Sequence, residues 1–531
     1  MKTLYKILSG AALMAAAVSC DYERINTNPY EMTEEEGRMD GVAVGAYITL
    51  MERSVFPVGT QANQTDIINE YQIAFNLSVD GWSGYFGQDN SWLSGNNPLT
   101  YYLYDGWLSS TYTNTYTNVL PSWKSLKSKS EENMPEVFAL AQILKISAWH
   151  KTLETFGPIP YTHAGEMALV IPFDSEKDVY TAIFNELQAA IEQLEPLGAN
   201  GDKVMADYDI VYKGDVAKWV KYARSLMLRL AMRLRYVDSA MANEWAAKAY
   251  GGSIDNLMNT PADEAKVGGD FVNNIQYLAE TYNECSMGST MFAYLNGYRD
   301  PRLSKYFKPS TVSWALDGYD GSKYAPLPPG TAAAAHMFAG RSVPNFEPTT
   351  PTYWMRASEV YFLLAEAALE WSGFGSAQDW YRQGIEMSFT ENGVSSSVDS
   401  YLNDTNVPVA VAVNVGTVNY SAPAPTTATT AYDGSNKEKA LEKIMIQKWI
   451  AMYPNGMEAW TEWRRTGYPK LNPVHENRGS AQGVTKESGI RRMTYPSSFS
   501  QSENDAANLA DAVSKLGGPD SPTTRLWWDC K

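Results

Sequence analysis

Cysteine and histidine are scarce in this sequence, with three cysteines and four histidines among 531 residues. The histidines are scattered, and neither an HExxH motif, a GxSxG nucleophile motif nor a Cys/His spacing typical of zinc sites accompanies them. We therefore expect no metal ion and no cofactor, and the residues give catalysis little support.

Positive charge is also in deficit. The sequence has 43 Lys and Arg against 60 Asp and Glu, which gives a formal net charge of −17. This excess of acid argues against nucleic acid and anionic lipid as partners. Beyond the N-terminus no stretch approaches a membrane-spanning length of about 18 apolar residues, so we expect no transmembrane helix.

The N-terminus reads as an export signal. Two lysines stand in the first ten residues, a short apolar run follows over residues 11–18, and Ser19-Cys20 closes the stretch. Residues 17–20, Ala-Val-Ser-Cys, resemble a bacterial lipobox, which implies that residues 1–19 are removed and that Cys20 is lipidated. The alternative is an ordinary signal peptide with an incidental cysteine. If Cys20 is lipidated, Cys285 and Cys530 remain, and we favour two free thiols because a chain of this size needs no disulfide.

Apolar residues recurring at steps of three and four predict a mostly α-helical protein. The predicted helices cover residues 33–56, 112–129, 135–157, 178–194, 215–234, 243–250, 353–371, 377–389 and 438–452. Residues 394–430 are predicted to be loop with a short strand pair, and the last eighty residues to be rich in loops. Consecutive helices of similar length favour either tetratricopeptide-like helix pairs or a plain helical bundle.

Two long blocks interrupt this pattern, at residues 59–107 and 252–352. Tyr (34) and Trp (16) together far outnumber Phe (16) in the chain, and the flat rings of Tyr and Trp suit stacking on sugars. Long irregular segments in a compact domain are usually functional, although most of the rings must simply fill the core. The predicted ligand-binding aromatic residues are Trp82, Tyr85, Trp92, Tyr294, Trp314 and Tyr319, with Asp66, Asn90 and Arg341 as neighbours that bond sugar hydroxyls.

Several stretches, taken in order, resemble one family. They are RDPRL at 299–303, RASEVYFLLAEA at 356–367, QKWIAMYPNGMEAW at 447–460, WRRTGYP at 463–469, RMTYP at 492–496 and WWD at 527–529. Together with Cys20 they resemble the SusD/RagB-type nutrient-binding lipoproteins of Bacteroidetes outer membranes. We interpret the charged residues of these motifs, such as Arg464 and Arg465, as structural. Arg356 and Glu359 are three residues apart, so they can pair with each other or with a neighbouring helix.

The resemblance implies a single domain over residues 20–531, in which four tetratricopeptide-like helix pairs carry a large irregular region. It implies a lipid-anchored protein on the cell-surface side of the outer membrane. Such a protein binds an oligosaccharide or polysaccharide and delivers it to a SusC-like TonB-dependent transporter without catalysis. The alternatives are a transporter lid with little glycan affinity of its own, a peptide-binding counterpart, or a glycosidase using Asp66 with Asp80 or Asp89. The resemblance does not indicate which glycan is bound.

Overall fold

The structure is a computed structural model that describes residues 41–311, 323–332 and 337–531. Residues 41–46 belong to a separate N-terminal unit, and residues 47–531 form one compact unit. Cys20, Trp314 and Tyr319 lie outside the described residues. Within them, Cys285 is buried, Cys530 is exposed, and both are free thiols, as predicted.

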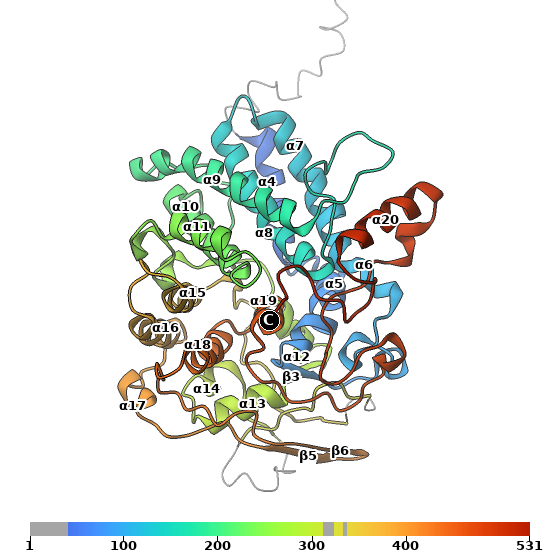
Figure 1. Cartoon of the computed structure of the whole chain (residues 1–531), viewed down its shortest axis with the longest axis vertical. Coiled ribbons are helices and arrows are strands. Elements are labelled where there is room, and N and C mark those ends of the chain that lie inside the picture. The colour runs from blue at the N-terminus through green and yellow to red at the C-terminus, as the bar shows by residue number, and fades with distance from the viewer. Residues whose placement is uncertain (1–40, 312–322, 333–336) are drawn as a thin grey trace, which may run out of the picture. The chain divides into compact units, whose positions relative to one another are not determined.

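Helices dominate the chain, as predicted (Figure 1). The longer helices are α4 (Val42–Val55), α5 (Gln64–Tyr71), α6 (Asp105–Thr113), α7 (Leu120–Ser130), α8 (Pro135–Phe156), α9 (Glu176–Asn200), α10 (Val216–Arg233), α11 (Ser239–Tyr250), α13 (Ser289–Gly297), α15 (Ala357–Glu370), α16 (Ala377–Glu391), α18 (Lys437–Ala451), α19 (Gly456–Thr466) and α20 (Glu503–Lys515). The shorter ones are α12 (Asn274–Glu280), α14 (Leu303–Tyr306) and α17 (Val398–Leu402), and two π-helical segments, η1 (Gln72–Asp80) and η4 (Asn114–Val119), extend neighbouring helices.

Local sequence explains where the scaffold helices begin and end. The Ser175 side chain caps α9 by accepting a hydrogen bond from the Asp178 amide, and Gly201 ends the helix at φ +76°. Asp215 caps α10 in the same way, through the Lys218 amide. Helix α8 begins with Pro135 in its first turn. These signals lie in the sequence itself, so the predicted bounds of α8 and α10 agree closely with the observed ones, whereas α9 continues six residues beyond its predicted end at residue 194.

Successive helices pack on one another, with contacts between α8 and α9, α9 and α10, α10 and α11, and α15 and α16. The predicted apolar face of α9 is fully buried in this stack, at Val179, Ile183, Leu187, Ile191 and Leu194. Pairwise stacking of consecutive helices is typical of helical repeats, and it agrees with the expected scaffold.

The prediction that the helical pattern lapses between residues 59 and 107 was wrong in part. Helical periodicity does not lapse after residue 59, because α5 and η1 occupy residues 64–80 and bury Ile68, Phe75 and Val79. Polar Asn, Gln and Asp between these residues masked the spacing. The last eighty residues are rich in loops, as predicted, although they also contain α19 and α20.

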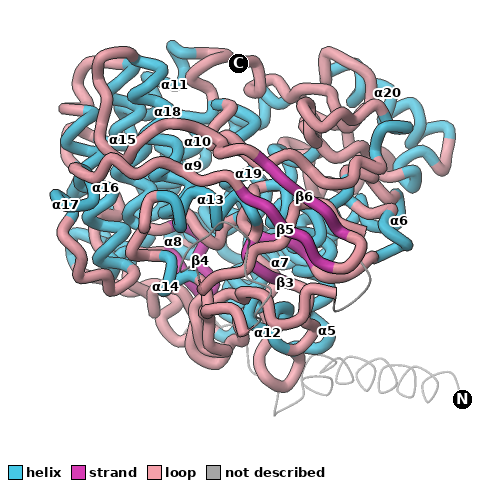
Figure 2. Tube along the Cα trace, turned by 90° about the horizontal axis from the view of Figure 1, so that it is seen from below, coloured by secondary structure: helices cyan, strands magenta, loops and turns pink. Residues whose placement is uncertain are grey.

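The described residues also form three two-stranded antiparallel sheets (Figure 2). They pair β1 (Phe86–Gln88) with β3 (Cys285–Met287), β2 (Ala265–Val267) with β4 (Thr352–Met355), and β5 (Val411–Val415) with β6 (Val418–Ala422). The β5–β6 hairpin confirms the strand pair predicted within residues 394–430. The β1–β3 pair matters most for function, since it joins the first irregular block to the second.

Buried ion pairs tie the helix pairs together. Arg233 of α10 is fully buried, and its guanidinium pairs with Glu154 of α8 at 2.9 Å and with Glu458 of α19 at 2.7 Å. It also pairs with Glu462 of α19. Removing one member of such a network leaves buried charges uncompensated, which costs about 3–5 kcal/mol.

The motif residues also form buried ion pairs, which confirms that they are structural. Arg465 pairs with Glu366 of α15 at 2.6 Å, and Glu359 accepts two hydrogen bonds from Arg229 at 2.6 and 2.7 Å. Arg356 pairs with Glu264 at 2.9 Å. Glu359 and Arg356 therefore pair with other segments of the chain and not with each other.

Candidate ligand-binding surface

The two irregular blocks meet where β1 pairs with β3. Phe86 lies opposite Met287 and Gln88 lies opposite Cys285, and Leu327 continues the pairing beside Gly288. Gly87 has no room for a side chain, because a Cβ there would lie 2.5 Å from the Leu327 Cβ. This close packing fixes the segment that follows β1.

Arg341 fastens that segment from the second block. Its Nη1 lies 3.2 Å from Asp89 Oδ2, its Nε donates to Ser286 Oγ at 2.5 Å, and its Nη2 donates to the Asn283 carbonyl at 2.5 Å. Arg341 is only 7% exposed. Arg341 therefore does lie beside the first irregular block. Its guanidinium contacts protein groups, however, so it positions the Asp89 segment and is not available for sugar hydroxyls.

Glu284 lies beside the same segment and is almost completely buried. Its carboxylate accepts hydrogen bonds from Gln72 Nε2 and, at 3.4 Å, from Asn90 Nδ2. Burial raises the pKa of Glu284 to about 7, against the effect of these two hydrogen bonds. Near neutral pH the Glu284 carboxyl can therefore act as a hydrogen-bond donor or acceptor, and it lies beside Asn90, which is two residues before Trp92.

The loop that carries Trp92 is held in a strained conformation. Leu93, Ser94 and Gly95 all have left-handed backbones, at φ +53°, +55° and +86°, and non-glycine residues adopt this region at a cost. A Cβ on Gly95 would lie 2.6 Å from the Ala332 Cβ, so packing against the second block enforces the turn. Such strain concentrates at functional sites.

Three aromatic rings form a partly exposed strip next to this turn, which we call the aromatic strip: Trp92, Trp107 and Tyr104. The Trp92 and Trp107 rings are 6.4 Å apart and the Tyr104 and Trp107 rings 5.8 Å apart, both edge to face. Tyr104 is 40% exposed and the two indoles are half-buried. The indole N–H of Trp92 is buried and has no hydrogen-bond partner within the described part of the chain. An unpaired buried donor is costly, so a ligand hydroxyl or carbonyl is a natural partner for it.

Three predicted site residues lie instead in the core. Trp82 is 6% exposed, packs 5.1 Å from the Trp460 ring and donates its N–H to the Pro98 carbonyl at 2.7 Å. The Tyr85 and Tyr294 rings both pack against Trp449 and are fully buried. Their burial leaves no ring face for a sugar, so a ligand-binding role for them stays a prediction that this geometry argues against.

The structure describes the other predicted site residues, Asp66, Trp314 and Tyr319, only in part or not at all. Asp66 belongs to α5, but its side chain lies outside the described residues, as do Trp314 and Tyr319 altogether. Tyr104 and Trp107 lie in the first irregular block but were not among the residues predicted to bind ligand, and neither was Glu284. The available signal for Tyr104 and Trp107 was their position at the start of α6, where the chain returns to a helix, whereas the contact of Glu284 with Asn90 has no signal in the sequence.

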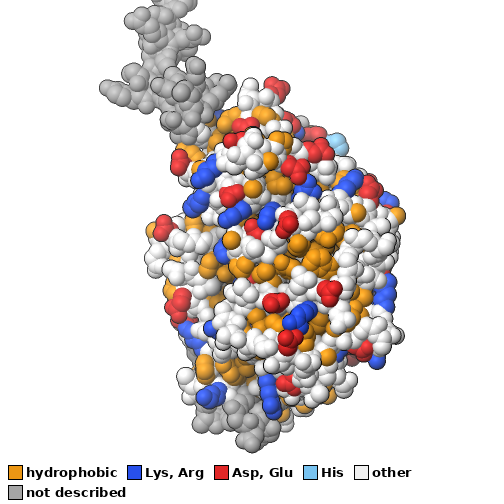
Figure 3. All heavy atoms as spheres, turned by 90° about the vertical axis from the view of Figure 1, so that its left-hand side faces the viewer, with side chains coloured by type: hydrophobic (Ala, Val, Ile, Leu, Met, Phe, Trp, Pro, Cys, Tyr) orange, Lys and Arg blue, Asp and Glu red, His pale blue; other side chains and the backbone are white. Residues whose placement is uncertain are grey.

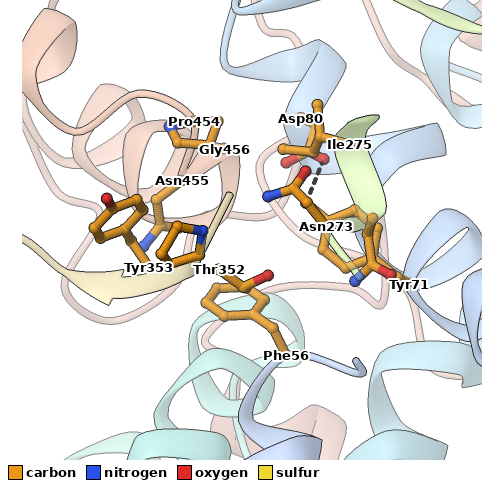
Figure 4. Close-up of a pocket in the computed structure, with 12 residues that line it drawn as sticks. Phe56, Tyr71, Asp80, Asn273, Ile275, Thr352, Tyr353, Pro454, Asn455 and Gly456 are labelled. Carbon is orange, nitrogen blue, oxygen red and sulfur yellow. Dashed lines mark hydrogen bonds between the residues drawn. The ribbon is translucent and has the colours of Figure 1, made fainter. Parts of the chain in front are cut away.

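Two partly open hollows are too small for a sugar. The first, drawn in Figure 4, lies between Phe56, Tyr71, Asp80, Asn273 and Tyr353 and has a volume of about 30 Å³. The second, beside Trp82, is of the same size. Either volume holds about one or two water molecules, whereas ligand pockets usually reach about 300 Å³ or more.

Asp80 at the first hollow has a structural role. Its carboxylate accepts hydrogen bonds from the Tyr71 hydroxyl at 3.0 Å and from the Gly456 amide at the start of α19. Burial nevertheless raises its pKa to about 7. Asp80 thus stabilises the N-terminus of α19.

Acidic and basic side chains are interspersed on the face seen in Figure 3, with apolar side chains between them. Among the described residues on that face there is no continuous basic stripe of the kind that binds nucleic acid. No helix in the described ranges is long and apolar enough to cross a bilayer.

The stacked helices and the ring-bearing irregular region define the class of protein: a helical-repeat scaffold that carries a binding surface. Residues 24–529 match the model of the SusD-like family, described as SusD and RagB outer membrane lipoproteins. The chain belongs to this family. A search of curated proteins gave no match.

Solved structures agree with that assignment. A chitin-binding SusD homologue from Flavobacterium johnsoniae is 32% identical, with a TM-score of 0.82 over 92% of this chain and 99% of the other. A SusD homologue from Bacteroides thetaiotaomicron is 31% identical, with a TM-score of 0.81 over 92% and 99% of the two chains. A third, from Bacteroides ovatus, is 31% identical, with a TM-score of 0.83 over 93% and 100%.

Proposed function

We propose that this protein is a lipid-anchored glycan-binding protein of the cell surface, without catalytic activity, that passes its ligand to a TonB-dependent transporter. Membership of an outer membrane lipoprotein family supports the location and the anchor at Cys20. The observation that carries glycan binding is the aromatic strip, with its unpaired indole N–H at Trp92.

The surface offers both contacts that a sugar needs. Ring faces of the strip stack on the C–H side of a pyranose, and the Trp92 N–H, Asn90 and the Glu284 carboxyl exchange hydrogen bonds with its hydroxyl or acetamido groups. Of the residues predicted from sequence, Trp92 is central, and Asp66, Trp314 and Tyr319 remain proposed contacts. Arg341 acts by positioning the loop.

Polymers of N-acetylglucosamine are the first ligand class to test. Two structural neighbours are chitin-binding proteins, at 32% and 25% identity. An acetamido carbonyl is also a good acceptor for a buried indole N–H.

Calorimetric titration of residues 21–531 with chitooligosaccharides and a panel of other glycans tests the proposal. Trp92→Phe keeps a ring but removes one donor, so affinity falls by about 2- to 12-fold. Trp92→Ala also removes the ring, and the expected loss is roughly 10- to 100-fold. The matched control is Trp371→Ala, because this half-buried indole lies at the end of α15 and its N–H donates to Ser239 Oγ at 3.3 Å. Equal affinities of wild type and Trp92→Ala for every binder would refute the site.

Two alternatives make different predictions in the same titration. A transporter lid with little glycan affinity of its own binds no member of the panel but still co-purifies with a β-barrel transporter. A peptide-binding counterpart is silent towards glycans and binds oligopeptides. Release of reducing ends from any bound glycan would contradict the absence of catalysis.

A further inference from the structure

An open hollow lies between the C-terminal turns of helices α4 and α5, and we call it the α4–α5 hollow. Its volume is about 220 Å³, and its lining residues are Leu50, Arg53, Ser54, Pro57, Val58, Ile67, Glu70 and Asn118. None of these residues carries an aromatic ring, so the hollow offers no ring face on which a sugar could stack. It is therefore a different kind of site from the aromatic strip.

Arg53 brings a positive charge to the hollow. It belongs to the last turn of α4, where its Nε donates to the Val58 carbonyl at 3.3 Å and its guanidinium lies over the Phe271 ring at 5.5 Å. Its Nη groups make no hydrogen bond, and no carboxylate pairs with them, within the described part of the chain. Partial burial lowers the pKa of Arg53, because no carboxylate compensates for the lost water. An anionic group in the hollow would supply that missing partner.

Glu70 brings a negative charge from the last turn of α5. Its Oε2 accepts a hydrogen bond from Asn118 Nδ2 at 3.0 Å, and no Lys or Arg among the described residues pairs with it. Partial burial raises the pKa of Glu70 against the effect of this hydrogen bond. Asn118 Nδ2 also lies 3.4 Å from Asn114 Oδ1, and Asn114 Nδ2 donates to the Ser54 carbonyl at 2.8 Å. These amides fix the Glu70 carboxylate relative to the end of α4.

Most of the remaining lining is apolar. Leu50 is 46% exposed, Ile67 is half-buried, and Pro57 and Val58 are buried behind them. Sites for small molecules usually combine an apolar wall with a few polar groups that fix the orientation of the ligand. The α4–α5 hollow has both parts.

The pair of opposite charges selects the class of ligand. Glu70 repels a simple anion such as phosphate and Arg53 repels a simple cation, whereas a zwitterion gives each of them a partner. The volume is below the range of about 300–1,000 Å³ that drug-sized ligands need. A free amino acid therefore suits the hollow better than a peptide or a glycan, and the apolar wall favours an aliphatic side chain.

We propose that the α4–α5 hollow binds a free amino acid with an aliphatic side chain. Arg53 binds the α-carboxylate and Glu70 binds the α-ammonium group. Leu50 and Ile67 contact the aliphatic side chain. This inference goes beyond the proposed function and does not depend on it, because none of these residues belongs to the aromatic strip.

Calorimetric titration of the full chain in detergent with L-leucine tests the site, and we expect one site of millimolar or tighter affinity. N-acetyl-L-leucine lacks the ammonium group and L-leucinamide lacks the carboxylate, so each should bind about 10- to 100-fold more weakly. Glycine lacks the aliphatic side chain, and its affinity should be lower by about 10-fold or more.

Two variants assign the charges. Arg53→Gln should abolish the preference for leucine over leucinamide, and Glu70→Gln should abolish the preference for leucine over N-acetyl-leucine, while each variant keeps the other preference. The matched control is Arg382→Gln, at an arginine of α16 that is 41% exposed and pairs with Asp399, and it should bind leucine like wild type. Glycan affinity should stay unchanged in all three variants.

Absence of binding by leucine, isoleucine and valine at millimolar concentrations would overturn the inference. Equal affinities for leucine, leucinamide and N-acetyl-leucine would also overturn it, as would wild-type leucine affinity in both Arg53→Gln and Glu70→Gln. Leucine binding by a protein that binds no glycan would support this site and refute the proposed function alone.

Discussion

Glu154 offers a direct test of the buried ion network. Its side chain is completely buried in α8, where it contacts Arg233 Nε at 2.9 Å, His150 Nδ1 at 3.2 Å and the Tyr180 hydroxyl at 3.3 Å. Burial by itself raises the pKa of this carboxyl, but the Arg233 and His150 contacts outweigh it and lower the pKa from 4.5 to about 2. The folded protein therefore holds this group ionised far into the acid range.

The lowered pKa has a definite sign for stability. The unfolded chain binds a proton near pH 4.5 and the folded chain only near pH 2, so the stabilisation is complete above pH 4.5 and is lost as pH falls towards 2. One pKa unit is equivalent to about 1.4 kcal/mol, so the difference between the unfolded and folded pKa values contributes about 3 kcal/mol to the free energy of unfolding at pH 7. At pH 3 the contribution is about 1.4 kcal/mol. Glu154→Gln imitates the protonated carboxyl, so it should remove this amount.

Equilibrium urea unfolding of wild type and Glu154→Gln at pH 7 and pH 3, followed by tryptophan fluorescence, measures the difference. We expect the variant to be less stable by about 3 kcal/mol at pH 7 and by about half of that at pH 3. A gap of the same size at both pH values would refute the reasoning. Glu244→Gln is the control, because Glu244 is 58% exposed and its pair with Lys248 contributes less than about 0.5 kcal/mol.

Two further predictions concern the site. Glu284 has a pKa of about 7 in the folded protein against an ordinary value of 4.5, so ionising it costs stability as pH rises from 4.5 to 7. Glu284→Gln lacks this charge, so its melting temperature relative to wild type should rise between pH 5 and pH 8. A difference in melting temperature that stays constant over this range would contradict the prediction. In Gly87→Ala the new Cβ meets Leu327 at 2.5 Å, so we expect a loss of about 1–3 kcal/mol and weaker glycan binding, because β1 carries the Trp92 loop. Unchanged glycan affinity in this variant would show that the loop does not depend on β1.

The helical scaffold was predictable because its signals are local. The spacing of Val179, Ile183 and Leu187, with a serine cap before them and a glycine after them, specifies α9 without knowledge of the rest of the fold. Segment α5–η1 was missed because polar residues alternate with its buried face. Helix α19 was recognised only as a motif, since its fully buried arginines look like surface residues in a sequence.

The site was less predictable because burial depends on partners that are distant in the chain. Tyr85 and Tyr294 lie in polar, glycine-rich surroundings, yet both pack on Trp449, more than 150 residues away from either. Trp92 differs from them through its partial exposure at a strained turn and through its unpaired N–H. Neither property can be inferred from residue type. The general location of the site could be inferred, because the first irregular block is rich in aromatic residues.

The motifs that identify the family are not the residues that choose a ligand. Arg464 donates to the Glu154 and Arg491 carbonyls at 2.7 and 2.8 Å and stacks on Trp460, and Arg465 is enclosed by Glu366 and Glu462. All of these groups are buried inside the protein, so none can contact a sugar. Relatives that share the motifs are therefore free to differ at the Trp92 loop without loss of the fold. Similarity of about 30% to chitin-binding relatives consequently fixes the scaffold, and the ligand has to be established at the aromatic strip itself.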